Sequence, residues 1–175
     1  MFSDPKKNIE QLELTEGMHV ADLGSGSGFY TLAAAKAVGA TGRVFSVDIQ
    51  KDLLARLKNT ATKEHLNNVE VICGDLEKPG STHLRDFSVD VAIASNILFQ
   101  LKEREAFVKE IKRIVKPGGR AFVVDWMDSF GGIGPQANDV VTLEKAKSLF
   151  EKEGFVLNKN ISAGAHHYGL IFKRT

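Results

Sequence analysis

A seven-residue segment near the N-terminus of this 175-residue chain combines one aspartate with three alternating glycines. Asp22 to Gly28 reads DLGSGSG and runs into an apolar helical pattern that starts near Phe29. Glycine adopts backbone angles that other residues rarely reach, so such a turn is tight and lets the backbone approach a ligand closely. The first turn of the following helix leaves unpaired N–H groups. The segment therefore predicts a ligand-binding turn between a strand and a helix.

The spacing of the glycines shows which kinds of nucleotide-binding turn this segment does and does not match. A dinucleotide-binding turn has the pattern Gly-x-Gly-x-x-Gly, and here Gly28 comes one position too early. A phosphate-binding loop of the Walker type needs a lysine after its last glycine, and this turn contains none. Asp22, at the end of the predicted strand, would repel a pyrophosphate but suits a cationic ligand. The turn therefore favours a positively charged nucleoside ligand over a dinucleotide.

The elements that must position this turn alternate along the chain as short β-rich runs and amphipathic helices. This alternation predicts βαβ units and a mainly parallel sheet. Several strands are continuous apolar runs, as expected when helices cover both faces of a sheet. The predicted strands are Met18–Leu23, Arg43–Asp48, Val69–Cys73, Val89–Ser95, Arg120–Trp126, Phe155–Ile161 and His167–Lys173. The predicted helices are one from near Phe29 and those at Gln50–His65, Glu103–Lys116 and Thr142–Glu153.

The last two predicted strands are separated by only about five residues, too few for a crossover helix, so they should form an antiparallel hairpin. That hairpin turns at the carboxyl edge of the sheet, where open α/β sheets bind ligands. His166, His167 and Tyr168 should lie near this edge, and a histidine there can accept a proton near neutral pH. Asp125, at the end of an adjacent strand, is a further candidate for substrate contact. The alternative is a strand-end histidine pair satisfied by solvent or backbone.

The chain resembles the class I S-adenosylmethionine-dependent methyltransferases. Their first motif, an acidic residue followed by Gly-x-Gly-x-Gly, is matched by Asp22 to Gly28. Asp48 ends the second predicted strand, 20 residues after Gly28, where the family's acidic residue accepts hydrogen bonds from both ribose hydroxyls. Gly74-Asp75-Leu76 follows the third strand, where the family typically places an aspartate on the adenine amino group. Ser95-Asn96 ends the fourth strand, beside the methionine moiety in the family.

Further matches narrow the resemblance to one branch. The turn Lys116–Gly119 matches the family's turn before its fifth strand. Asp4-Pro5 and His167-Tyr168 are similar to the ubiquinone/menaquinone C-methyltransferase-like branch. The resemblance implies a three-layer α/β sandwich with helices on both faces of a seven-stranded, mostly parallel sheet. The implied strand order is 3-2-1-4-5-7-6, with strand 7 antiparallel, in a single domain over residues 1–175.

The resemblance implies S-adenosylmethionine as the cofactor, S-adenosylhomocysteine as its product and no metal. A general base is needed only for some acceptors, and no catalytic triad is visible, so the catalytic residue stays unassigned, with His167, Tyr168 and Asp125 as candidates. The acceptor atom and the identity of the acceptor stay open. The implied cofactor-binding residues are Asp22, Gly24, Ser25, Gly26, Gly28, Tyr30, Asp48, Ile49, Gly74, Asp75, Leu76, Ser95 and Asn96.

Two segments are candidates for covering the acceptor side. Residues 127–140 are rich in glycine and are long for a connection, so they are either a lid or a plain connector. Residues 1–17 form an N-terminal arm. The acceptor pocket is expected to be open, closed by these two segments or completed by a second subunit, in a monomer or a homodimer. Trp126 is expected either to line this pocket or to pack in the core.

The composition sets the remaining expectations. The formal net charge of +1 gives no global attraction to nucleic acid or to anionic lipid. Asn96 to Phe99 lacks the Asn-Pro-Pro-Tyr pattern of methyltransferases that act on nucleic-acid bases, which disfavours nucleic acid without excluding RNA. The single cysteine, the absence of a charged-then-apolar leader and the absence of an apolar run of about 20 residues predict a cytoplasmic protein without a membrane span.

Three functional hypotheses stay open at this point. The first is an active methyltransferase on a small molecule, a protein or RNA. The second is a non-catalytic module that binds S-adenosylmethionine or S-adenosylhomocysteine and regulates a partner. The third is a nicotinamide-dependent oxidoreductase, against which the glycine spacing argues.

Overall fold

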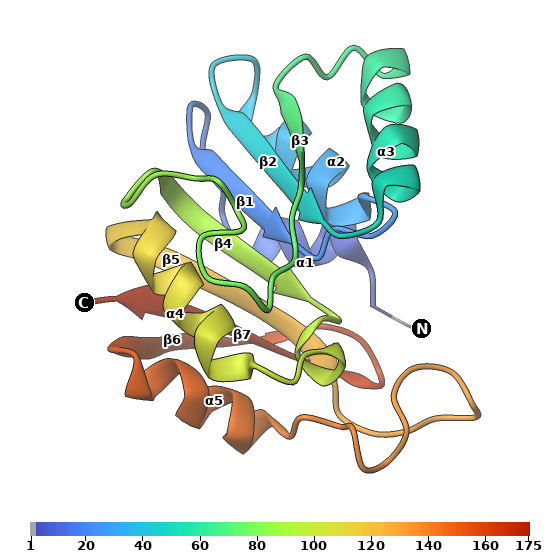
Figure 1. Cartoon of the computed structure of the whole chain (residues 1–175), viewed down its shortest axis with the longest axis vertical. Helices are drawn as coiled ribbons and strands as arrows, with labels where there is room; N and C mark the ends of the chain where they lie inside the picture. The colour runs from blue at the N-terminus through green and yellow to red at the C-terminus, as the bar shows by residue number, and fades with distance from the viewer. Residues whose placement is uncertain (1–2) are drawn as a thin grey trace.

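Seven strands form one sheet in the order β3-β2-β1-β4-β5-β7-β6 in the computed structural model, which describes residues 3–175 (Figure 1). The parallel part pairs β2 with β3, β1 with β2, β1 with β4, and β4 with β5. β7 is antiparallel to both β5 and β6. The strands are β1 His19–Leu23, β2 Arg43–Asp48, β3 Val69–Cys73, β4 Val89–Ser95, β5 Val115–Trp126, β6 Phe155–Ser162 and β7 His167–Arg174. This confirms the fold class, the strand order and the C-terminal hairpin predicted from the sequence.

Helices cover both faces of the sheet (Figure 1). On one face, buried residues of α1, α2 and α3 pack against Val20, Val44 and Val91 of the sheet. On the other, α4 and α5 pack against Ala21 and Val123. The helices are α1 Pro5–Gln11, α2 Phe29–Val38, α3 Lys51–Lys63, the 3-10 turn η1 Leu98–Gln100, α4 Arg104–Ile114 and α5 Leu143–Lys152.

Side-chain caps fix the starts of two helices, α5, which the sequence predicted, and α1, which it did not. Thr142 caps α5 and accepts a hydrogen bond from the backbone N–H of Lys145. Asp4 caps α1 in the same way, accepting from the N–H groups of Lys6 and Lys7, and Pro5 follows at the first helical position. The N-terminal arm therefore contains a helix that the sequence analysis did not predict.

The turn before β5 is part of the strand and not a separate connection. Val115 already pairs with Val89, whereas Arg120 pairs with Val91, so the register shifts across residues 116–119. The predicted start of this strand at Arg120 was therefore wrong, and α4 ends at Ile114, before the predicted end of its helix at Lys116. This irregularity accommodates the glycines of the turn, and the pairing of β4 with β5 resumes at Arg120.

The connection from β3 to β4 contains no helix among its residues 74–88. A buried carboxylate of α4 holds it instead: Glu110 accepts hydrogen bonds from the Thr82 hydroxyl at 2.6 Å and from the Gly80 N–H at 3.2 Å. Arg113 donates to the same carboxylate at 2.8 Å and to Asp86 at 2.6 Å. This network fixes the loop whose first residues lie at the carboxyl edge of the sheet.

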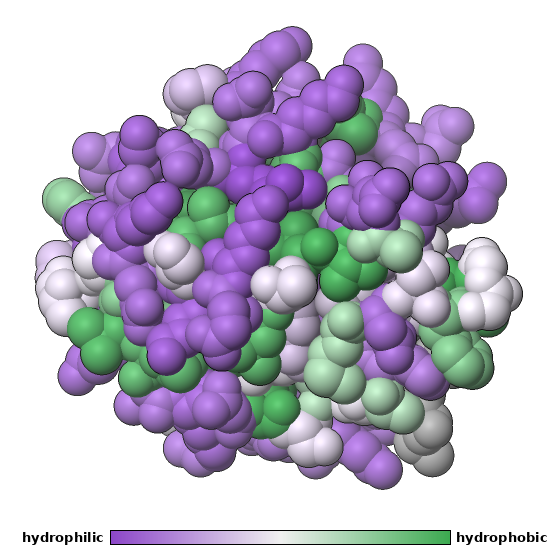
Figure 2. Space-filling model, turned by 90° about the horizontal axis from the view of Figure 1, so that it is seen from below, coloured by the Kyte–Doolittle hydropathy of each residue, from purple (hydrophilic) through white to green (hydrophobic). Residues whose placement is uncertain are grey.

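The surface at the end of the molecule that carries α5 and the 127–142 loop is mixed in character. Figure 2 shows this end from below: hydrophilic residues predominate, and hydrophobic residues lie in patches between them. None of the helices in the described part of the chain combines the length and apolar character that crossing a bilayer requires.

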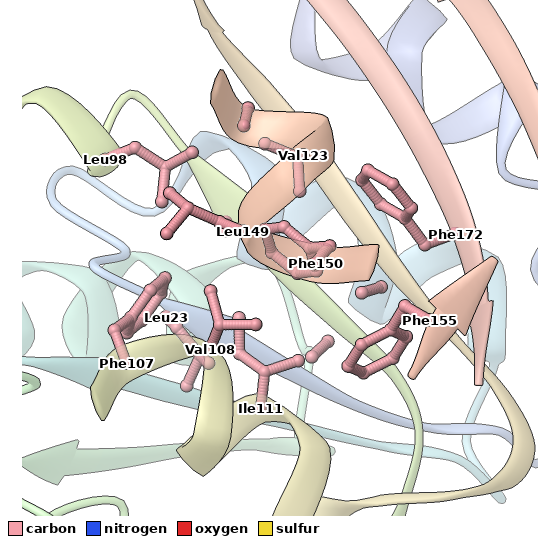
Figure 3. Close-up of a cluster of buried hydrophobic side chains, with 14 of the residues drawn as sticks. Leu23, Leu98, Phe107, Val108, Ile111, Val123, Leu149, Phe150, Phe155 and Phe172 are labelled. Atoms are coloured by element: carbon pink, nitrogen blue, oxygen red, sulfur yellow. The ribbon is translucent and has the colours of Figure 1, made fainter. Parts of the chain in front are cut away.

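The core beneath α4 and α5 is built largely from aromatic and branched aliphatic side chains (Figure 3). Phe150 stacks on Phe172 with ring centroids 4.7 Å apart and contacts Phe155 edge-on at 5.6 Å. Phe107 of α4 is fully buried in the same cluster. This cluster fixes α4 and α5 on the sheet, and with them the 3-10 turn that precedes α4.

Phe107→Ala should lower the free energy of unfolding by about 3–5 kcal/mol, because it removes a buried ring and leaves a cavity. Urea denaturation followed by circular dichroism measures this loss. Lys109→Ala, an exposed position on the same helix, is the control and should change stability by less than about 0.5 kcal/mol. Equal losses in the two variants would contradict the assignment of Phe107 to the core.

Candidate functional site

Three adjoining cavities follow the carboxyl ends of the parallel strands, the edge where open α/β sheets bind ligands. We name them the β2–β3 cavity, of about 230 Å³, the β1–β4 cavity, of about 460 Å³, and the β5 cavity, of about 230 Å³. Gly24, Gly26 and Gln100 line both the first and the second. Ser3 and Asn96 line both the second and the third. The three cavities therefore form one extended site.

Most of the lining residues come from the loops that directly follow the strands. The β2–β3 cavity is further lined by Asp48, Ile49, Gln50, Gly74, Asp75, Leu76, Glu77, Ile97 and Leu101. The β1–β4 cavity is further lined by Pro5, Asp22, Ser25, Phe29, Tyr30 and Ser95. The β5 cavity is completed by Trp126, Ile133 and His167.

The glycine turn after β1 uses all three glycines in left-handed conformations. The φ angles are +78° at Gly24, +52° at Gly26 and +80° at Gly28. A side chain at Gly24 would collide with Ile97, and one at Gly28 would collide with Leu57 of α3. At Gly26, by contrast, an added Cβ would meet nothing within 4 Å. Gly26 therefore exposes bare backbone to the site, whereas Gly28 serves the packing of α2 and α3 and lines none of the three cavities.

Asp48, at the end of β2, holds the glycine turn. One carboxylate oxygen accepts a hydrogen bond from the Gly26 N–H at 2.8 Å, and the other accepts from the Gln50 N–H at 2.9 Å. Asp48 is 7% exposed, whereas the neighbouring Ile49 is 60% exposed. A carboxylate oxygen accepts more than one hydrogen bond, so Asp48 retains acceptor capacity toward a ligand in the β2–β3 cavity.

Asp22, at the end of β1, is a buried acid beneath the β1–β4 cavity. Its carboxylate accepts a hydrogen bond from the Thr31 hydroxyl at 2.6 Å, and only 2% of the residue is exposed. Burial raises the pKa of Asp22 to about 6, although the hydrogen bonds from Thr31 oppose the shift. A cation in the cavity would stabilise the charged form of this carboxylate.

The ends of β3 and β4 bring the other predicted residues into the same site. Gly74 leaves no room for a side chain, because an added Cβ would collide with the Ser81 carbonyl. Asp75 accepts from the Glu77 N–H at 3.1 Å and pairs with Lys78 at 3.2 Å, at the mouth of the β2–β3 cavity. Asn96 has a left-handed φ of +53° and a buried side-chain oxygen without a partner among the described residues.

Tyr30 connects the site to the N-terminal arm. Its hydroxyl lies 3.2 Å from the Ser3 hydroxyl and accepts a hydrogen bond from the Asn8 amide at 2.8 Å. The Asn8 amide also donates to the Ser3 hydroxyl at 2.8 Å. This triad places Ser3 and Pro5 in the wall of the β1–β4 cavity.

His167 lines the β5 cavity beside Trp126. The pairing of β5 with β7 places His167 opposite Trp126, and their ring centroids are 4.3 Å apart. His167 is 5% exposed, and neither ring nitrogen has a hydrogen-bond partner within residues 3–175. Burial lowers the pKa of His167, and the neighbouring His166 adds to the effect. The imidazole is therefore neutral at pH 7 and offers one donor and one acceptor.

The same strand pairing turns Asp125 and Tyr168 away from the cavities. They lie opposite each other on the other face, since successive side chains of a strand alternate. Asp125 is fully buried and accepts from the N–H groups of Leu98 and Trp126, each at 2.8 Å. Tyr168 packs in the core cluster beneath α4 and α5. The structure therefore supports a catalytic role for neither residue.

Burial acts in the same direction on these two titratable groups, because it disfavours the charged form of each. Burial raises the pKa of Asp125 to about 6, although the backbone N–H groups that it binds oppose the shift. Burial also raises the pKa of the Tyr168 phenol well above its usual range. Asp125 joins the end of β5 to η1, so it positions one wall of the site, and it lines none of the three cavities.

Several lining residues escaped the sequence analysis. Gln50, Ile97 and Glu77 directly follow predicted residues, so the rule that ligands bind just beyond strand ends would have found them. Gln100 and Leu101 reach the site only because η1 turns the chain back. The other missed residues are Ser3, Pro5, Phe29 and Ile133.

The buried polar atoms that lack partners gather at this site. Among the described residues, seven buried side-chain nitrogen or oxygen atoms have no hydrogen-bond partner. Four of them belong to residues that line the cavities: Ser25 Oγ, Asn96 Oδ1 and both ring nitrogens of His167. Because an unpartnered buried polar group is costly, this concentration fits a site that a polar ligand completes.

Comparison with known proteins identifies the class that this fold and site define. The model of a family described as a methyltransferase domain matches residues 14–147. The chain is 28% identical to a SAM dependent methyltransferase from Aquifex aeolicus, whose crystal structure superposes with a TM-score of 0.88 over 99% of this chain and 91% of that one. The chain therefore belongs to the class I S-adenosylmethionine-dependent methyltransferases, which confirms the resemblance seen in the sequence.

Two curated relatives differ in the acceptors that their names state. An arsenite methyltransferase from Halobacterium salinarum is 31% identical over 155 residues, which are 81% of this chain and 38% of that protein. A ubiquinone/menaquinone biosynthesis C-methyltransferase from Burkholderia cenocepacia is 30% identical over 118 residues, 67% of this chain and 47% of that protein. The chain thus spans less than half the length of either relative.

Gly26→Val should weaken binding of S-adenosylhomocysteine at least about tenfold, because the branched side chain fills the open space that faces the cavity. Isothermal titration calorimetry measures the affinity. Gly80→Val is a matched control, since Gly80 also has a positive φ and open space around it but lies outside the site. Both variants carry backbone strain of about 1–2 kcal/mol. Unchanged affinity in Gly26→Val would refute the placement of the ligand on this turn.

Asp22→Asn should stabilise the ligand-free protein relative to wild type at pH 7 by about 1–3 kcal/mol, and much less at pH 4. The folded-state pKa of Asp22, about 6, lies above its ordinary 3.8, so Asp22 contributes stability below pH 3.8 that is lost as the pH rises through 6. Denaturant unfolding of both proteins at several pH values measures the difference. A stability difference that does not depend on pH would contradict the burial of an ionisable Asp22.

Proposed function

We propose that this chain transfers a methyl group from S-adenosylmethionine to a small-molecule acceptor held in the β5 cavity. One observation supports this proposal above the others. The three adjoining cavities run from Asp48 past Asp22 to His167, and the unpartnered buried polar atoms at the site lie in the last two of them. That order suits an adenosine, an amino-acid cation and an acceptor, in turn.

The residues of the first two cavities suit the parts of the cofactor. Asp48 offers carboxylate oxygens to the ribose hydroxyls, while Ile49 and Leu76 give the adenine apolar walls and Asp75 accepts from its amino group. Five other implied cofactor residues line the second cavity, next to the methionine part: Asp22, Ser25, Tyr30, Ser95 and Asn96. Gly24 and Gly26 contribute backbone to both, and Gly28 contributes by letting α2 approach α3.

The bound cofactor supplies an electrophilic methyl group on a positively charged sulfur. The protein contributes position and electrostatics, and alignment of reactants alone is worth about 7–11 kcal/mol. Asp22 adds a negative charge beneath the second cavity, where its pKa of about 6 leaves it ionised at pH 7. His167, not Tyr168 or Asp125, is the residue that we place on the acceptor side.

The segment 127–140 closes the acceptor side as a lid. Gly134 packs on the Trp126 indole, and an added Cβ there would lie 2.6 Å from the ring. Ile133 lines the β5 cavity. His166 stacks on Phe130 with centroids 4.0 Å apart and lies 3.0 Å from an Asp128 carboxylate oxygen, so the lid is tied to the start of β7.

The names of the relatives suggest two kinds of acceptor, arsenite and a compound of ubiquinone/menaquinone biosynthesis, and the residues that line the cavities favour one kind over the other. Thiolates are the side chains that bind soft, thiophilic centres such as trivalent arsenic. The only cysteine in the sequence, Cys73, is exposed at the end of β3 and lines none of the three cavities. Arsenite held by thiolates is therefore not the acceptor that these residues favour.

The setting of the reaction follows from composition. We place the protein in the cytoplasm because its single cysteine suits a reducing compartment. The near-neutral charge favours a small molecule over RNA.

Calorimetry against S-adenosylmethionine, S-adenosylhomocysteine and NAD, followed by transfer of a radiolabelled methyl group to pools of small molecules, proteins and RNA, tests this function. We expect binding of the first two ligands, no binding of NAD and label in the small-molecule pool. Tight cofactor binding without transfer to any pool would favour a regulatory module. Binding of NAD alone would overturn the proposal.

Gly134→Ala should lower the rate of methyl transfer severalfold while leaving S-adenosylhomocysteine affinity unchanged, because the new methyl group pushes the lid off Trp126. Steady-state transfer assays and calorimetry measure the two effects. Gly131→Ala is the matched control: it has a positive φ in the same segment, but its Cβ would meet nothing within 4 Å. Equal rates in the two variants would mean that the segment is a plain connector.

A further inference from the structure

The β5 cavity combines apolar walls with a small set of polar groups. Trp126 and Ile133 supply the apolar surface, and Ser3, Asn96 and His167 supply the polar groups. The cavity measures about 230 Å³ and adjoins the β1–β4 cavity through Ser3 and Asn96. A cavity of this kind takes a small molecule with an apolar body and one or two polar atoms.

The polar atoms of this cavity call for a hydrogen-bond donor on the ligand. Asn96 carries a buried side-chain oxygen, and His167 carries two buried ring nitrogens, with no partner for any of them within the described chain. A neutral imidazole has one acceptor nitrogen, so the cavity holds two unpartnered acceptors and one unpartnered donor. A carboxylate ligand could accept from the donor but would leave both acceptors unsatisfied, and a hydrocarbon would satisfy none of the three.

The charges around the cavity disfavour a charged ligand. None of its described lining residues carries a carboxylate or a cationic group at pH 7, since burial lowers the pKa of His167. Asp125 faces the opposite side of the sheet, and Asp128 is paired with His166. An ammonium ion in this cavity would therefore lose its hydration without gaining a counter-charge, which is a costly exchange.

We infer that the β5 cavity binds a neutral, hydroxyl-bearing molecule with an apolar body, whose hydroxyl hydrogen-bonds to His167 and Asn96. A hydroxyl both donates and accepts, so it satisfies an acceptor and the donor together. The inference rests on the proposed function only in calling this molecule the methyl acceptor. The binding itself is measured without any transfer of the methyl group.

Trp126 gives the experiment a direct readout. It is the only tryptophan of the chain, and it lines the cavity, so its fluorescence reports on occupancy there. The probes are benzyl alcohol, toluene, benzoate and benzylamine, which share a ring and differ in one substituent that is neutral and polar, apolar, anionic or cationic at pH 7.5. The titrations use the whole chain, saturated with S-adenosylhomocysteine. We expect a saturable change with benzyl alcohol at an affinity about tenfold above those of the other three.

Two neighbouring variants separate the role of His167 from general effects of burial. His167→Phe keeps a ring beside Trp126 but removes both nitrogens, so it should weaken benzyl alcohol binding about tenfold and bring it level with toluene. Tyr168→Phe is the matched control, because it also removes a buried unpartnered polar atom, from the opposite face of the same strand. It should leave the affinity for benzyl alcohol unchanged. Calorimetry with S-adenosylhomocysteine should give the same affinity in all three proteins.

The outcomes distinguish this inference from the proposed function. Similar affinities for all four probes, or a preference for benzoate or benzylamine, would overturn the inference while S-adenosylhomocysteine binding stands. Unchanged benzyl alcohol binding in His167→Phe would remove His167 as the partner. Failure of the wild-type chain to bind S-adenosylhomocysteine would instead refute the proposed function.

Discussion

The hydrogen bond from the Gly26 N–H to the Asp48 carboxylate is the interaction on which the site depends. It joins the turn after β1 to the end of β2. The backbone pairing of these two parallel strands ends just before this hydrogen bond, at Leu23 and Val47. The other Asp48 oxygen holds Gln50 at the start of α3. One side chain thus fixes the backbone that lines the first two cavities, and it does so from a buried position where its hydrogen bonds are strong.

The two buried aspartates, Asp22 and Asp125, differ in role: Asp22 lines a cavity, whereas Asp125 holds the backbone around the site. Burial raises the pKa of both Asp22 and Asp125 to about 6, but their surroundings differ. Asp22 lines a cavity and accepts from a hydroxyl, so a ligand's charge can act on it. Both carboxylate oxygens of Asp125 accept hydrogen bonds from backbone N–H groups, one in η1 and one in β5. Asp125 therefore holds the wall of the site that carries Asn96 and Trp126. A raised pKa alone does not mark a catalytic acid in this protein.

Most of the sheet and most residues that line the first two cavities could be predicted from the sequence, whereas the choice of which side chains of β5 and β7 face the β5 cavity could not. The bounds of β2, β3 and β4 match the prediction, because β-rich runs that end at Asp48, Cys73 and Ser95 mark where each strand stops. α1 was missed because its seven residues give too short a pattern, and only its Asp-Pro cap signals it. The lid residue Ile133 has no sequence signal, since it reaches the site through the path of a loop.

The sequence by itself determined the fold class and the glycine turn, because both rest on local patterns: strand and helix periodicity, and an acid followed by alternating glycines. Only the tertiary structure shows that His167 lines a cavity whereas Tyr168 and Asp125 do not. β5 and β7 are buried on both faces, so the order of their residues does not tell which side chains face the helices and which face the site. The pairing of Trp126 with His167 fixes that choice, and a shift of one residue would have reversed it.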